Sequence, residues 1–112
     1  MAPWARVFRA EECPPGTGRF VRAGTLELAV FHVREPDAFI VIPNSCPHAG
    51  GNLSAGELNE TVVRCPWHQW EFDLRTGACV HNEQVRVRRY TVRVEDGWLE
   101  LDLTPSPAQP LT

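Results

Sequence analysis

Two short motifs rich in metal-ligating side chains constrain the fold of this chain more than any other feature. Residues 46–48 read Cys-Pro-His and residues 65–68 read Cys-Pro-Trp-His, with residues 49–64 between them. Thiolates and imidazoles are strong ligands for transition metals, and the proline and glycine around both motifs are typical of exposed loops. The sequence therefore predicts two loops that clasp one metal site, and its four candidate ligands are Cys46, His48, Cys65 and His68.

The distribution of these ligands between the two loops favours one kind of site. Most two-arm zinc sites take both thiolates from one arm and both imidazoles from the other. In this chain each arm supplies one cysteine and one histidine. That mixture suits a two-iron cluster in which one iron takes two cysteines and the other takes two histidines. With these motifs the chain resembles the Rieske [2Fe–2S] family, and the resemblance extends from about Val7 to Leu103.

The resemblance implies one [2Fe–2S] cluster per chain, held by the four candidate ligands. Cys46 and Cys65 would bind one iron, and His48 and His68 would bind the other at the exposed tip. Two neutral imidazoles in place of two thiolates bring the oxidised site close to zero net charge, which lowers the cost of adding an electron in a low-dielectric pocket. A mononuclear zinc ion held by the same residues is the alternative at this stage.

Positions near the motifs differ from those of high-potential members of the family. Those members carry an extra cysteine in each loop, joined as a disulfide, where this chain has Gly51 and Trp67. They also donate hydroxyl hydrogen bonds to cluster sulfur from positions that are Trp70 and Phe72 here. Fewer donors stabilise the reduced cluster less. We therefore expect a low-potential, ferredoxin-like protein near the bottom of the Rieske range of about −150 to +300 mV.

The composition describes a globular chain and excludes several classes of function. The 112 residues are 43% hydrophobic and include ten prolines and eight glycines, which is typical of short strands and many turns. A formal charge of −3 is too small to indicate binding to nucleic acid or an anionic membrane. No segment resembles a signal peptide or a membrane span. We therefore expect a soluble, cytoplasmic protein with neither nucleic acid nor a membrane among its partners.

The cysteines and histidines outside the motifs are expected to be structural. Cys13 and Cys79 are far apart in sequence, and in a reducing compartment we expect two buried free thiols. A disulfide between them is the alternative. His32 and His81 lie outside both motifs and are expected to be packing or surface residues rather than ligands.

Apolar runs and alternating patterns predict an all-β fold. Strands are expected over residues 5–9, 19–22, 25–33 and 38–43, and again from Val85 through a hairpin turn at 95–97 to a last strand over 98–103. Residues 44–78, which carry the motifs, are poor in regular pattern. This order resembles the Rieske fold, an antiparallel β-sandwich base with a small inserted cluster-binding subdomain. We expect a single domain over 1–104, with the insert at about 44–78, and a disordered tail over 105–112.

The resemblance implies an electron-transfer protein that is not itself an enzyme. It would be a soluble one-electron carrier of the Rieske ferredoxin type, passing electrons from a flavin-dependent reductase to a terminal oxygenase such as a dioxygenase. The sequence carries no nucleotide-binding fingerprint and no nucleophile elbow that would indicate another activity. Two alternatives stay open, namely the small Rieske-like subunit of a nitrite reductase and a zinc-stabilised binding module.

Overall fold

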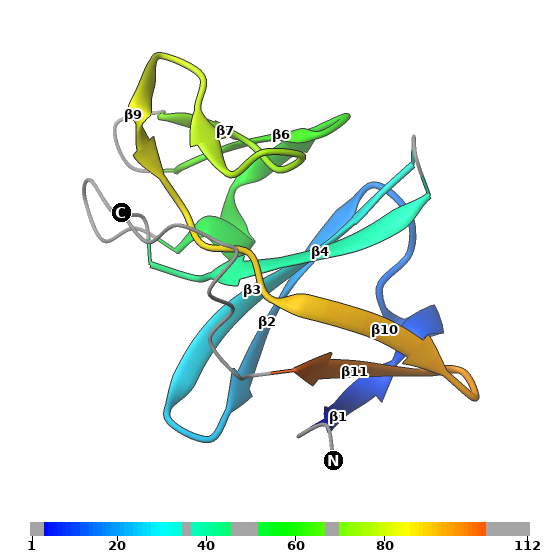
Figure 1. The fold of residues 1–112 in the computed structure, drawn as a ribbon. Helices are drawn as coiled ribbons and strands as arrows, with labels where there is room; N and C mark the ends of the chain where they lie inside the picture. The colour runs from blue at the N-terminus through cyan, green and yellow to red at the C-terminus, as the bar shows by residue number, and fades with distance from the viewer. Residues whose placement is uncertain (1–3, 35–36, 46–51, 67–69, 103–112) are drawn as a thin grey trace.

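The computed structural model describes residues 4–34, 37–45, 52–66 and 70–102. Within these residues the chain forms three antiparallel sheets and two short 3-10 helices (Figure 1). In chain order the elements are β1 (Trp4–Arg9), η1 (Ala10–Glu12), β2 (Thr17–Ala23), β3 (Leu26–Val33), β4 (Ala38–Pro43), η2 (Leu53–Ala55), β5 (Glu57–Asn59), β6 (Val62–Arg64), β7 (Glu71–Asp73), β8 (Ala78–Cys79), β9 (Asn82–Arg86), β10 (Thr91–Glu95) and β11 (Trp98–Asp102). The predicted all-β class is confirmed. Neither 3-10 helix in this described part has the length and hydrophobicity needed to span a membrane.

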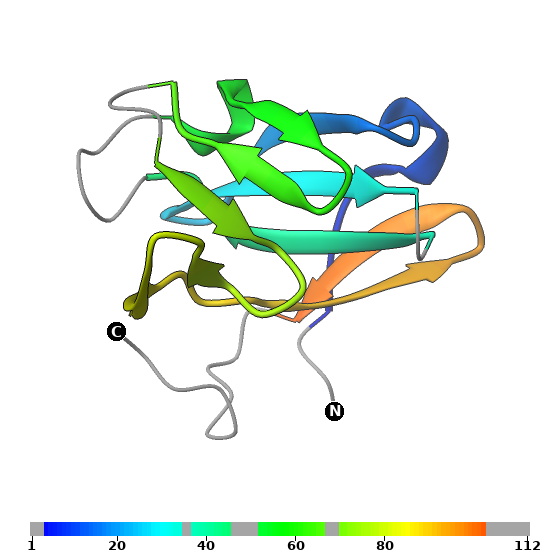
Figure 2. The same ribbon diagram turned by 90° about the horizontal axis from the view of Figure 1, so that it is seen from above.

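The sheet β2-β3-β4 lies in the middle of the molecule. The sheet β1-β11-β10 packs on one of its faces, and the sheet β5-β6-β7-β8-β9, called here the insert sheet, packs on the other (Figures 1 and 2). Two hydrophobic cores separate these layers. Leu28 and Val30 of β3 belong to the core on the β11 side, whereas Ala29 and Phe31 belong to the core on the insert side. The continuous apolar run over 28–31 is therefore buried on both faces, as its pattern predicts.

The region that carries the motifs contains more regular structure than its sequence pattern suggests. Five short strands, β5 to β9, pair in sequence order as consecutive antiparallel neighbours. The poor pattern over 44–78 thus conceals regular strands, and the insert sheet continues beyond the predicted insert to Arg86. Strands β5, β6 and β7 have three residues each and β8 has two. Strands this short cannot display the alternation on which prediction from sequence depends.

The predicted hairpin turn between the last two strands is confirmed. Glu95 pairs with Trp98, and the two residues between them have positive φ, 54° at Asp96 and 80° at Gly97. Two central residues with positive φ give the tight turn that matches the twist of antiparallel strands. The hairpin places β11 between β10 and β1 in one sheet. This sheet and the sheet β2-β3-β4 are together called the base below.

Cys13 and Cys79 are buried free thiols, as expected. Cys13 lies in the core on the β11 side, and Cys79 lies in the core on the insert side. Burial raises the pKa of the Cys13 thiol, so the group stays protonated and unreactive.

A buried carboxylate ties the first and last strands together. The Glu100 side chain is only 8% exposed, and its oxygens accept hydrogen bonds from Arg93 Nε at 2.8 Å and Arg6 Nε at 3.0 Å. Each guanidinium also lies over an indole ring, Arg93 over Trp4 and Arg6 over Trp98. The hydrogen bonds from Arg93 and Arg6 lower the pKa of Glu100 below its ordinary value of 4.5.

Ionised Glu100 should therefore stabilise the fold in a pH-dependent way. A carboxyl whose folded pKa is depressed contributes stability that is fully present above the unfolded pKa and is lost as pH falls through the folded pKa. We expect Glu100→Gln to lower the melting temperature at neutral pH, and to flatten its decline below about pH 4.5. Thermal unfolding followed by circular dichroism measures both.

Glu27→Gln is the matched control for this experiment. The Glu27 side chain is 55% exposed in its ion pair with Arg22, and an exposed pair contributes little to stability. Identical acid profiles for wild type and Glu100→Gln would show that the buried carboxylate does not contribute as described.

Candidate metal centre

The structure describes one of the four predicted ligands. Cys65 follows directly after β6, and it is fully buried. Cys46, His48 and His68 lie outside the described residues. The elements that flank these residues are described, and they show how the two loops are held. Residues 45–52 are called the first arm below, and residues 65–70 the second arm.

Backbone pairing closes the first arm at its base. Ser45 and Asn52 form an antiparallel bridge across the arm. Asn44 and Leu53 flank this bridge on the side away from the arm, and the Leu53 N–H donates to the Asn44 carbonyl oxygen at 2.7 Å. Leu53 begins η2 and is fully buried in the core on the insert side. The arm therefore starts and ends on fixed points of the fold.

The second arm is closed in a similar way. The Cys65 N–H donates to the Trp70 carbonyl oxygen at 2.7 Å, directly beyond the pairing of Arg64 with Glu71. Cys65 packs in the same core as Phe72, which is also fully buried. The predicted ligand thus sits where a strand of the insert sheet enters the arm.

The topology of the insert sheet brings the bases of the two arms together. The first arm leads through η2 into β5, and β6 leads directly into the second arm. Because β5 and β6 are antiparallel and Glu57 pairs with Arg64, the chain that follows the first arm and η2 lies beside the start of the second arm. A Cβ on Gly56 would collide with the Arg64 carbonyl oxygen. Glycine therefore permits this close approach, immediately before Cys65.

This arrangement fits a cluster with mixed ligands. The buried thiol of Cys65 offers one of the two thiolates that such a cluster needs, and it lies next to the place where the other arm re-enters the sheet. Among the described residues no three His, Cys, Asp or Glu side chains converge on another metal position. Sequence reasoning did not single out Gly56, because a glycine after a short helix is common in loops and only the distance to Arg64 reveals its role.

A cross-strand row of charges borders the bases of the arms. Arg64 lies between Glu57 at 4.0 Å and Glu71 at 3.3 Å, and Glu71 also contacts His81 at 3.2 Å. Most of these side chains are substantially exposed, so solvent screens the row and it contributes little to stability. His81 is a surface residue, as expected, and its ring is paired with Glu71.

The turn after the second arm is structural. Asp73 accepts hydrogen bonds from the Arg75 backbone and side chain, and the bond from the Arg75 side chain lowers the pKa of Asp73. Gly77 has a φ of 81°, and its carbonyl oxygen accepts a 2.7 Å hydrogen bond from the Val87 N–H. This hydrogen bond therefore joins the turn to Val87, in the segment that leads from the insert sheet back to the base.

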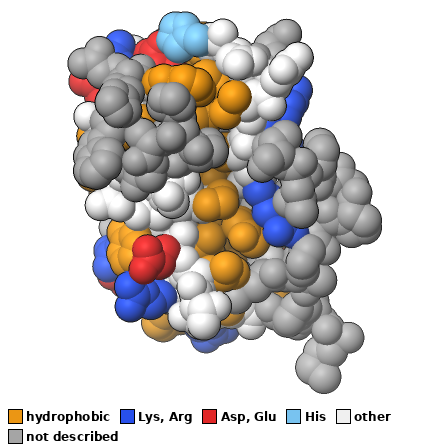
Figure 3. All heavy atoms as spheres, turned by 90° about the vertical axis from the view of Figure 1, so that its left-hand side faces the viewer, with side chains coloured by type: hydrophobic (Ala, Val, Ile, Leu, Met, Phe, Trp, Pro, Cys, Tyr) orange, Lys and Arg blue, Asp and Glu red, His pale blue; other side chains and the backbone are white. Residues whose placement is uncertain are grey.

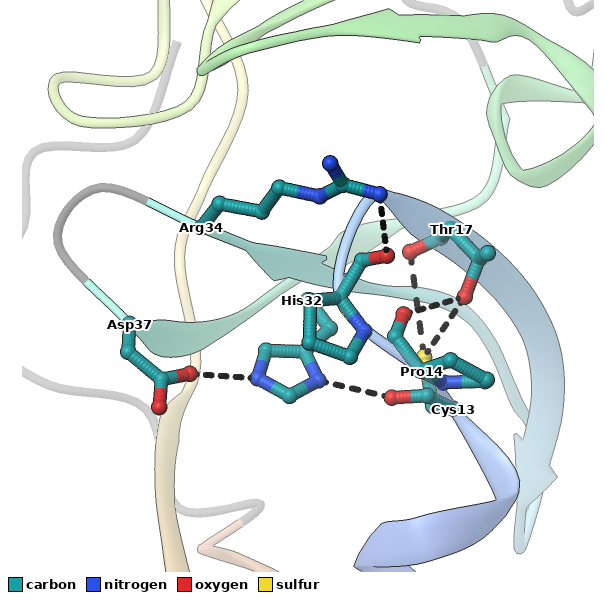
Figure 4. Close-up of polar contacts among 7 residues, drawn as sticks. Cys13, Pro14, Thr17, His32, Arg34 and Asp37 are labelled. Atoms are coloured by element: carbon teal, nitrogen blue, oxygen red, sulfur yellow. Dashed lines mark hydrogen bonds and ion pairs between the residues drawn. The ribbon is translucent and has the colours of Figure 1, made fainter.

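His32 is held by hydrogen bonds in the base of the molecule and is not a ligand (Figure 4). Its Nδ1 lies 2.7 Å from the Cys13 carbonyl oxygen, and its Nε2 lies 2.6 Å from Asp37 Oδ1. The ring stacks on Phe39 with centroids 4.1 Å apart. Both nitrogens are thus engaged, and the expected packing role is confirmed.

Comparisons with known proteins agree on one family. A family model described as "Rieske [2Fe-2S] domain" matches residues 3–92. The anthranilate 1,2-dioxygenase ferredoxin subunit of Burkholderia cepacia is 37% identical, with 92% of this chain and 94% of that protein covered. The nitrite reductase (NADH) small subunit of Salmonella typhimurium is 29% identical, with 90% and 98% covered. A chain of the complex of reduced oxygenase and oxidised ferredoxin in carbazole 1,9a-dioxygenase superposes with a TM-score of 0.80 at 32% identity, with 91% of this chain and 94% of that chain covered.

The close approach at Gly56 generates a prediction. A methyl group there must displace the Arg64 backbone next to Cys65, so Gly56→Ala should destabilise the protein by about 1–3 kcal/mol, the usual cost of overpacking. We also expect it to reduce the yield of protein with bound cluster. Urea unfolding measures the first effect and visible absorbance the second.

Ala55→Ser is the matched control, because Ala55 is an exposed neighbour in η2 and surface changes usually stay within about 0.5 kcal/mol. A Gly56→Ala protein with wild-type stability and cluster content would show that the arms are not held together at this point.

Proposed function

The chain belongs to the Rieske [2Fe–2S] family, and we propose that it carries single electrons from a flavin-dependent reductase to a terminal oxygenase. The observation that carries the proposal is the similarity of nearly the whole chain to the ferredoxin subunit of a dioxygenase. The protein is an electron carrier, and the cytoplasm is its proposed compartment.

The four predicted ligands are the proposed binding residues for the cluster. Cys46 and Cys65 would hold one iron, and His48 and His68 the other. Bound there, the cluster supplies reversible uptake of one electron. The contribution of the chain is to fix the ligands in place, through the closed bases of both arms and the burial of Cys65. The buried Phe72 offers no hydroxyl at a position where high-potential members have one, which supports a low potential.

The surface beside the insert sheet supports transient docking of partners. Figure 3 shows the side that is on the left in Figure 1, where hydrophobic side chains form a band with charged side chains toward its margins. Interfaces that form and separate repeatedly are about as apolar as the rest of a protein surface, so this mixed surface is compatible with one. Such an interface suits a carrier that meets a reductase and an oxygenase in turn.

The ligand assignment predicts a clear difference between histidine variants. His48→Ala and His68→Ala each remove an imidazole from the proposed site, so we expect loss of the cluster or an altered electron paramagnetic resonance spectrum. His32→Ala is the control, because both nitrogens of His32 are bound within the base. It should lower stability and leave the spectrum unchanged. A wild-type spectrum in either arm variant would refute the assignment.

The midpoint potential tests the proposed class of carrier. Film voltammetry across neutral and alkaline pH should give a reversible one-electron wave at about −150 mV, near the bottom of the Rieske range. The potential should be constant at neutral pH and fall at alkaline pH, because the ligand imidazoles then lose protons on oxidation. A potential well above zero would instead indicate a quinol-oxidising type of protein.

A subunit of a nitrite reductase is the second candidate function. The observation that favours it is the similarity to the NADH nitrite reductase small subunit. The presence of all four ligand residues in this chain favours a working carrier. Stable co-purification with a large catalytic chain would support the subunit, whereas a free carrier should purify alone and reduce an oxygenase on mixing.

A further inference from the structure

The buried amide of Asn44 lies directly before the first arm. Asn44 and Glu100 are the buried polar or charged residues of the described part, at 4% and 6% exposure. A polar side chain is rarely buried without hydrogen bonds that offset its desolvation. We infer that Asn44 is a positioning residue that sets the place of the ligands Cys46 and His48, an inference that rests on the proposed cluster assignment.

The side chain of Asn44 spans the base of the first arm. Its Oδ1 accepts a hydrogen bond from the Ser54 N–H at 2.9 Å, and its Nδ2 donates to Asn52 Oδ1 at 3.2 Å. Asn52 is the last residue of the arm and Ser54 follows it, whereas Asn44 precedes it. The amide therefore connects the two ends of the arm through its oxygen and its nitrogen together.

The backbone of Asn44 fixes the same point to the centre of the fold. Its N–H donates to the Glu27 carbonyl oxygen at 2.9 Å, and its carbonyl oxygen accepts from the Leu53 N–H at 2.7 Å. Glu27 belongs to β3, and Leu53 is buried in the core on the insert side. The first arm therefore follows directly after a residue whose backbone is fixed to β3 and to Leu53. The side chain of Asn44 sets the spacing between the two ends of the arm.

This spacing bears on the cluster and not only on the fold. Cys46 is two residues from Asn44, so a change at the base of the arm would shift a ligand relative to Cys65 in the other arm. Orientation of ligands and of the hydrogen bonds around them tunes a metal site. Removal of the amide should therefore alter the spectrum and potential of the cluster, which a residue that merely adds stability would leave unchanged.

The test compares leucine at two asparagines. Asn44→Leu keeps the size of the side chain and removes both hydrogen bonds, whereas Asn59→Leu makes the same substitution at an exposed position at the end of β5. We expect Asn44→Leu to broaden or shift the electron paramagnetic resonance lines, to shift the midpoint potential, and to speed cluster loss about fivefold. Asn59→Leu should match wild type in all three.

Two further variants keep the inference testable if Asn44→Leu does not fold. Asn52→Ala removes one of the two side-chain bonds and should give a smaller change of the same kind. Asn44→Asp keeps an acceptor for the Ser54 N–H. It can also accept a hydrogen bond from the side-chain amide of Asn52 once that amide is flipped by 180°, so this variant should keep the wild-type line shape.

The outcomes separate this inference from the proposed function. A lower melting temperature in Asn44→Leu and Asn52→Ala with unchanged spectrum and potential would overturn it, because the amide would then be purely structural. A wild-type protein without any Rieske spectrum would overturn the cluster assignment itself, and with it this inference.

Discussion

Burial of β3 on both faces is the constraint on which the rest of the structure depends. Leu28 and Val30 face the core shared with β11, and Phe31 and Val33 face the core shared with the insert sheet. A strand buried on both sides must be covered twice, because its apolar side chains gain free energy only when both faces leave water. The sheet β1-β11-β10 and the insert sheet are these two covers, so both pack on the same central strand.

A short series of contacts connects this central strand to the candidate site and fixes the site's position. Asn44 follows β4, is tied to Glu27 of β3, and closes the first arm through its amide. After the first arm and η2 the chain reaches Gly56, whose missing side chain lets it pass close to Arg64, the residue before Cys65. Local hydrogen bonds thus close the described ends of both arms. Binding loops on a rigid scaffold commonly follow this pattern.

The sequence was informative where its signals are long or chemically specific. The strands of the base were predictable because runs such as 28–31 are long enough to show burial, and the turn at Asp96-Gly97 carries a residue pair that favours positive φ. The strands of the insert sheet were not, because two or three residues show no periodicity and their pairing depends on tertiary contact. The candidate ligands follow from residue type alone. Asn44 gave no such signal, because its contacts arise only once the arm has closed.

The pairing of β1 with β11 determines the order in which the ends of the chain can open. Trp4 lies opposite Asp102, so both described ends of the chain lie at the same end of the β1–β11 ladder. Fraying from there breaks the ladder one pair at a time and meets the Arg6–Glu100 pair at the third step. Neither arm belongs to this sheet. Opening from the described ends therefore separates β1 from β11 before it reaches either arm.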